Sequence, residues 1–143
     1  MLSVKLNDLP LRTTWTENVP GQRAHSTFPF LGAEENENTS VVYFELDAGN
    51  ELGSHTDSAE EILLIMAGSV EVTVGDETTI VEGPSLALVP TMVPHNLRNV
   101  GATRAKVVGF FPSRYIVATF ENAWLPDNAS ILDTEQILLS MQR

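Results

Sequence analysis

The sequence contains no cysteine. This absence excludes disulfide bonds, thiolate nucleophiles, iron–sulfur clusters and zinc sites built from cysteine. Any metal ion would have to be held by histidine, aspartate or glutamate, and the chain has only three histidines. No covalent or metal staple is needed for folding, because a chain of 143 residues is long enough to bury about 68–70% of its unfolded surface as a single domain.

Basic residues are also scarce. Eight Lys and Arg stand against 19 Asp and Glu, which gives a formal net charge of −11 at pH 7. This charge would repel a phosphate backbone, so we expect neither nucleic acid nor an anionic membrane as a partner. The chain has no apolar run of about 18 residues, and Asn7, Asp8 and Pro10 interrupt the N-terminus where an export signal would be apolar. We therefore expect a cytoplasmic protein.

The centre of the chain contains short, regularly spaced strand signals. Ser40 to Asp47 is rich in β-branched and aromatic residues, and Gly75-Asp76 is typical of a hairpin turn. Seven or eight strands at this spacing leave no room for crossover helices, so the sequence predicts an all-β sandwich or barrel. Further strands are expected at 62–66, 69–74, 78–82, 86–89, 95–100 and 106–111.

The two ends of the chain have a different character. The first residues hold three prolines and little periodicity, so they are expected to form an irregular arm. Near the C-terminus, Asp133 to Gln136 resemble a helix N-cap with a capping box, which predicts a short helix at about 134–142 that packs as a lid. Within one domain, 1–143, we expect an N-terminal arm at 1–39, a barrel at 40–120 and a tail at 121–143.

Two of the three histidines stand close to carboxylates in the sequence. His55 and Asp57 are two residues apart, so in an extended segment their side chains point to the same face. Glu61 begins the next predicted strand and faces the apolar interior, and His95 begins another strand. These four residues are candidate metal ligands. His25, in the predicted arm, is expected to be a surface histidine instead.

The spacing of these residues resembles the two motifs of the cupin family. Gly49 to Gly68 reads G-x5-H-x-D-x3-E-x6-G, against the family's G-x5-H-x-H-x3–4-E-x6-G. Gly83 to Asn99 reads G-x6-P-x-M-x2-H-x3-N, against G-x5-P-x-G-x2-H-x3-N. The chain departs from the first motif at Asp57, and from the second by one extra residue before Pro90 and by Met92 in place of a glycine.

This resemblance implies a single conical jelly-roll β-barrel that holds one divalent metal ion, such as Fe, Mn, Zn or Ni. Transferred position by position, the family's ligands fall on His55, Glu61 and His95, and Asp57 occupies the place of the remaining histidine. If Asp57 binds the ion, two imidazoles and two carboxylates surround it, a set suited to Mn, Fe or Zn. If it does not, the other three form a facial triad of the kind that binds Fe(II).

Asp57 has other roles open to it as well. It could orient a histidine, act as a general base, or mark a site that has lost its metal. Around the site we expect a mainly apolar pocket, although core packing is the favoured interpretation of each single wall residue. The wall candidates are Tyr43, Leu63, Ile65, Met92, Leu97, Phe110 and Phe111, with Arg98 and Arg114 as the nearby cations.

The sequence predicts a metal-dependent enzyme that acts on a small organic molecule, either a dioxygenase or a sugar or uronate isomerase, with Glu61 and Asp57 as its catalytic carboxylates. The alternative is a small-molecule-binding or sensor protein without catalysis. Residues 62–66 and 107–111 are apolar at consecutive positions, so we expect their outer face to be covered by the N-terminal arm or by a second subunit, and a homodimer is predicted on this ground. The segment 110–120 resembles the end of small cupins, which implies that the chain leaves the barrel there and packs across its outside.

Overall fold

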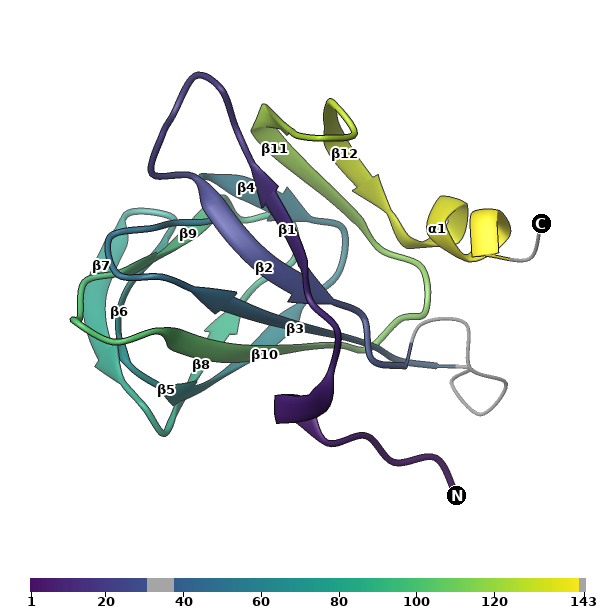
Figure 1. Ribbon diagram of the computed structural model, residues 1–143, viewed down its shortest axis with the longest axis horizontal. Helices are drawn as coiled ribbons and strands as arrows, with labels where there is room; N and C mark the ends of the chain where they lie inside the picture. Colours follow the sequence, from purple (N-terminus) through teal and green to yellow (C-terminus); the bar gives the residue numbers. More distant parts are fainter. Residues whose placement is uncertain (31–37, 142–143) are drawn as a thin grey trace.

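Two six-stranded antiparallel sheets make up most of the protein in the computed structural model, which describes residues 1–30 and 38–141 (Figure 1). The strand order is β1-β2-β3-β10-β5-β8 in one sheet and β12-β11-β4-β9-β6-β7 in the other. The elements are η1 Leu6–Asp8, β1 Arg12–Trp15, β2 Arg23–Thr27, β3 Ser40–Leu46, β4 His55–Asp57, β5 Glu61–Ala67, β6 Ser69–Val74, β7 Glu77–Glu82, β8 Ser85–Val89, β9 His95–Asn99, β10 Ala105–Phe111, β11 Val117–Trp124, β12 Ala129–Asp133 and α1 Thr134–Met141.

The inner faces of the two sheets form one hydrophobic core. On β5, Leu63 and Ile65 alternate with outward residues and are fully buried, and Val70 and Leu97 from the other sheet are buried with them. This period-2 alternation is what an antiparallel sheet with one covered face requires. The predicted all-β jelly-roll is confirmed, and each central strand lies within one residue of its predicted position.

The N-terminal segment is more regular than predicted. Residues 12–15 and 23–27 form β1 and β2, and β2 pairs with β3, so the prediction of an irregular arm is wrong for these residues. The strands are short and separated by a proline-containing loop, and their stability comes from pairing with the sheet edge, which leaves little local signal. Residues 31–37 of the predicted arm and 142–143 of the predicted tail lie outside the described residues.

The C-terminal segment joins a sheet instead of crossing the outside of the barrel. In β11, Ala118 pairs with Asp57 and Phe120 pairs with His55, so β11 lies beside β4. The predicted helix is confirmed as α1, and Asp133 Oδ1 accepts a hydrogen bond of 2.9 Å from the Glu135 N–H at its start. The tail therefore reaches the neighbourhood of the predicted metal ligands.

Asn99, the last residue of the second motif, is a structural clamp. Its side-chain amide is fully buried and donates hydrogen bonds to the carbonyl oxygens of Leu46 and Thr103, while its Oδ1 accepts one from the Gly101 N–H. One side chain thus joins β3, β9 and the turn that follows β9. This keeps the polar group satisfied and fixes the strand that carries His95.

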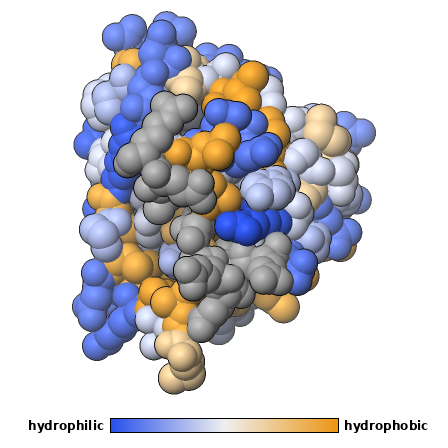
Figure 2. Space-filling model, turned by 90° about the vertical axis from the view of Figure 1, so that its right-hand side faces the viewer, coloured by the Kyte–Doolittle hydropathy of each residue, from blue (hydrophilic) through white to orange (hydrophobic). Residues whose placement is uncertain are grey.

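Figure 2 shows the end of the molecule that carries α1, where hydrophobic side chains lie among hydrophilic ones. Within residues 1–30 and 38–141, no helix is long and apolar enough to cross a membrane.

Candidate metal centre and its pocket

The candidate ligands meet where β4 and β9 run side by side. His55 and His95 are directly paired across the two strands, and Asp57 follows His55 on the same face. The potential ligand atoms of His55, Asp57 and His95 all lie within 4.8 Å of one another, and all three residues are buried. The structure therefore brings together two histidines and one carboxylate that the sequence predicts as ligands.

Both imidazoles are held in one orientation by the backbone. His55 Nδ1 lies 2.9 Å from the Gly53 carbonyl oxygen, and His95 Nδ1 lies 2.9 Å from the carbonyl oxygen of Val93. A carbonyl only accepts, so each Nδ1 carries the proton and donates it. Nε2 of each ring is therefore the nitrogen left for a metal ion, which it binds when it carries no proton, and this is the arrangement found in metal-binding histidines.

Two buried polar atoms in the cluster have no hydrogen-bond partner among residues 1–30 and 38–141. These atoms are Asp57 Oδ2 and His95 Nε2, which lie 3.0 Å apart without forming a hydrogen bond with each other. An unpaired buried polar atom is costly. A metal ion would satisfy both atoms at once, so the residues present fit a divalent cation.

Glu61 approaches the same point from the opposite sheet. Its Oε1 lies 3.5 Å from His95 Nε2, and its side chain is buried. Room for this carboxylate comes from Gly109 on the neighbouring strand β10, because a Cβ atom there would collide with Glu61 Oε2. Sequence reasoning missed Gly109, although an isolated glycine inside an apolar strand is a signal for such a close approach. Glu60, the residue before Glu61, is exposed.

The electrostatics of the cluster favour one bound cation. Burial alone would lower the pKa of His95, but Asp57 and Glu61 together raise it to about 10. Burial raises the pKa of Glu61 to about 7, and the negative charge of Asp57 adds to this effect. Burial lowers the pKa of His55 to about 4. A proton on His95 or a metal ion would each supply the positive charge that the two carboxylates attract.

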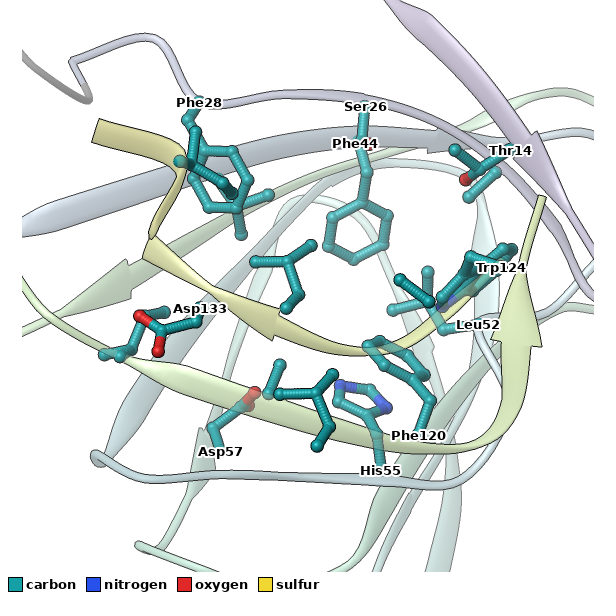
Figure 3. A pocket seen from close by; sticks show the side chains of 18 of the residues that line it. Thr14, Ser26, Phe28, Phe44, Leu52, His55, Asp57, Phe120, Trp124 and Asp133 are labelled. Atoms are coloured by element: carbon teal, nitrogen blue, oxygen red, sulfur yellow. The ribbon is translucent and has the colours of Figure 1, made fainter. Parts of the chain in front are cut away.

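A pocket of about 870 Å³ opens directly from the cluster, and His55, Asp57 and Glu61 line it. In Figure 3, His55 and Asp57 lie on one side of the cavity and Phe44 and Ser26 on the other. The Phe120 ring stacks on His55 with 4.4 Å between ring centres and 15° between ring planes. Trp124, in turn, meets Phe120 edge to face at 5.5 Å. An aromatic wall therefore begins at a candidate ligand.

The predicted wall residues divide into three groups. Leu63, Leu97 and Phe111 line the pocket. Tyr43 and Ile65 are buried in the protein but are not among the described lining residues, and Met92 and Phe110 are exposed at the surface. Alternation along the strands could identify inward positions but could not separate pocket from core.

The charged residues near the pocket also differ from expectation. Neither Arg98 nor Arg114 is among the lining residues that the structure describes. The lining cation is Arg12, whose two terminal nitrogens bind the carboxylate of Asp127 at 2.6 and 2.7 Å. His25 stands outside the metal cluster on β2, where its ring contacts Thr13 and Asp47 and is largely buried.

Comparison with known proteins gives the same fold. Residues 42–111 match the family model described as a cupin domain. An uncharacterized protein of Streptomyces coelicolor is 28% identical over 96 residues, which is 67% of this chain and 91% of that protein.

Solved structures with a similar fold include a recombinant oxalate oxidase in complex with glycolate, with a TM-score of 0.60 and 22% identity over 71% of this chain. Oxalate decarboxylase from Bacillus subtilis has a TM-score of 0.65 and 13% sequence identity over 81% of this chain. The Cnp3 cupin domain of Schizosaccharomyces pombe has a TM-score of 0.64 and 17% identity over 78% of this chain. The chain spans 56%, 30% and 74% of these three proteins, in the same order. Residues 42–111 of this chain are therefore a cupin domain.

Proposed function

We propose that the protein binds one divalent transition-metal ion through His55, Asp57 and His95, with Glu61 beside it, and acts as an enzyme on a small organic molecule in the adjoining pocket. The observation that carries the proposal is the orientation of the two imidazoles, each with Nδ1–H donated to a carbonyl oxygen and Nε2 available. The buried Asp57 Oδ2 supports the proposal as well, because it has no hydrogen-bond partner among the described residues and is free to bind an ion. Such fixed orientation of ligands is typical of metal centres.

When bound, the ion would polarise a substrate oxygen as a Lewis acid or, if it is redox-active, support chemistry with dioxygen. The chain's own residues would do the rest. The apolar walls would exclude water, and Phe120 would hold His55 in place by stacking. Glu61 lines the pocket, so its carboxylate can serve as a fourth ligand or can accept a proton from a substrate held there.

Both reaction classes predicted from the sequence remain proposals. A dioxygenase would need a redox metal, whereas an isomerase would work with Zn or Mn and a carboxylate base. Bacillus subtilis oxalate decarboxylase, which shares the fold at 12% identity, has Mn(II) centres, so Mn belongs with Fe, Zn and Ni among the metals to test.

A second candidate is a small-molecule-binding protein without catalysis. It is favoured by the size and apolar character of the pocket, which could hold a ligand whether or not an ion is bound. Bound metal together with turnover of any substrate would exclude this candidate. A pocket that binds a ligand in a protein without metal would favour it.

The first test is elemental analysis of protein purified without a tag or chelator. We expect about one equivalent of a transition metal in the wild type and none in His95→Ala, since a ligand is removed. The matched control is His25→Ala, which removes the histidine outside the cluster and should retain the metal. An unchanged metal content in His95→Ala would contradict the ligand assignment.

A Glu61→Gln variant assigns the role of Glu61. If Glu61 is a ligand, the variant should lose metal, and if it is a base, the variant should keep its metal and lose activity.

A further inference from the structure

We propose that the pocket takes an uncharged, predominantly apolar molecule and discriminates against small dianions such as oxalate. This inference names the substrate class of the site and rests on the proposed function only for the metal ion at the pocket's base. It is drawn from the size, lining and charge of the pocket. It sets this chain apart from the oxalate enzymes whose fold it shares.

The first argument is size. The cavity measures about 870 Å³, near the upper end of the ~300–1,000 Å³ that pockets for drug-sized ligands occupy. A diacid as small as oxalate would fill only a small part of it. The remaining volume would hold water against apolar walls, which is unfavourable.

The second argument is the chemistry of the walls. Aromatic and aliphatic side chains from both sheets and from α1 face the cavity (Figure 3). Among them are Phe28, Phe44, Phe120, Trp124, Leu132 and Ile137. Burying an apolar ligand surface here would contribute roughly 25 cal/mol for each Å² removed from water. Flat aromatic groups would in addition find Phe120 and Trp124 as stacking partners.

The third argument is charge. Among the described lining residues, one cation faces four carboxylates, and that cation, Arg12, is bound at both nitrogens by Asp127. At the base of the pocket, Asp57 and Glu61 already balance the charge of a divalent ion. A dianion would therefore add two negative charges to a centre that is already neutral, in an apolar cavity whose described lining has no unpaired Lys or Arg to compensate them, which is unfavourable.

The test uses two probes of the same shape and different charge. Benzophenone is an uncharged two-ring ketone, and 4-benzoylbenzoate carries one carboxylate on the same rings. Binding is followed by quenching of Trp124 fluorescence in a Trp15→Phe background, because Trp15 is not among the described pocket residues. We expect benzophenone to bind at least about tenfold more tightly than 4-benzoylbenzoate, with and without Mn(II), and oxalate to bind more weakly than benzophenone.

A pair of variants links this preference to the pocket. Ile131→Lys places a cation at the pocket, and Ile80→Lys places one on β7, at the opposite edge of the same sheet; both isoleucines are exposed, at 58% and 61%. The first should narrow or reverse the preference for benzophenone, and the second should leave it unchanged. An equal or stronger affinity of wild type for 4-benzoylbenzoate or oxalate would overturn the inference, and so would a folded Ile131→Lys protein with unchanged preference.

The proposed function and this inference fail separately. Metal uptake without benzophenone binding would overturn the inference and leave the metal site standing. Benzophenone binding by a protein that takes up no metal would support the pocket assignment and overturn the proposed metal centre.

Discussion

The base of the pocket and its walls come from different parts of the chain. His55, Asp57 and Glu61 at the base lie within the cupin domain, residues 42–111. Most of the wall lies outside it, on β1 and β2 before the domain and on β11, β12 and α1 after it. The base is polar and the walls are apolar. The comparison teaches that the candidate metal centre and most of the wall of its pocket come from different segments of the chain, so that variants can be designed to test each of them.

The largest expected effect is a loss of metal affinity caused by a substitution at the base of the pocket that leaves the walls unchanged. Asp57→Asn keeps the shape of the side chain and removes its charge, so we expect metal affinity to fall by roughly 10–100-fold or more. Asp127→Asn, at the exposed rim of the same pocket, should retain full affinity. Metal titration by calorimetry measures both. Equal affinities in the two variants would show that Asp57 does not hold the ion.

A companion variant separates the roles of Asp57. Asp57→His restores the residue that the family motif has at this position. A higher metal occupancy with retained activity would identify Asp57 as a weak ligand, whereas a higher occupancy with lower activity would identify it as a base.

The pH dependence of metal binding is the next largest effect. Because the pKa of His95 is raised to about 10, its Nε2 holds a proton at neutral pH that a metal ion must displace. Metal affinity should therefore rise with pH between 6 and 9 by roughly tenfold per unit for each proton released. Calorimetry in buffers of different ionisation enthalpy counts the protons. An affinity that is flat over this range would show that His95 is already unprotonated in the free protein.

A smaller effect is expected where the two sheets meet behind Glu61. Gly109→Ala places a methyl group against Glu61 Oε2 and 2.9 Å from Val42 Cγ1. Such overpacking should lower the free energy of unfolding by about 1–3 kcal/mol and displace Glu61. Gly21→Ala is the matched control, since the nearest atom to its new Cβ would be 3.6 Å away. Urea denaturation compares the two variants. Equal unfolding midpoints would mean that the side chains around Gly109 move to accept the methyl group without loss of stability.

The smallest effect on the stability of the fold is expected from a substitution on the outer surface of the sheet that contains β5, β8 and β10. Ile62 pairs with Phe110 and Leu88, and all three side chains are exposed, on a face that ends at the edge strand β8. The homodimer predicted from the sequence would cover this face. Leu88→Lys should then give a monomer with little change in unfolding midpoint, whereas Ile80→Lys, on the other sheet, should stay dimeric. Light scattering at micromolar concentration decides, and a monomeric wild type would contradict the prediction.

The central strands were predictable, and so was the meeting of His55, Asp57 and His95, because their signals are local. A continuous apolar run marks β5, period-2 alternation marks β6, and the spacing of His55, Asp57, Glu61 and His95 marks the candidate site. The parts of the wall on β2 and β11 were not predictable, since these strands are defined by the strands they pair with and not by their own composition. Arg12 was missed for the same reason, because its place at the pocket depends on the docking of β1.

The position of β11 also has a consequence for the order of events during synthesis. Strand β4, which carries His55 and Asp57, has β9 on one side and β11 on the other. Strand β11 pairs with β4 through residues 118–120, and these residues leave the ribosome after His55 and His95 have emerged. Nascent domains fold as cooperative units, and pairings between distant segments form slowly. Ion capture should therefore be a late event in the life of the nascent chain, completed after translation has passed β11.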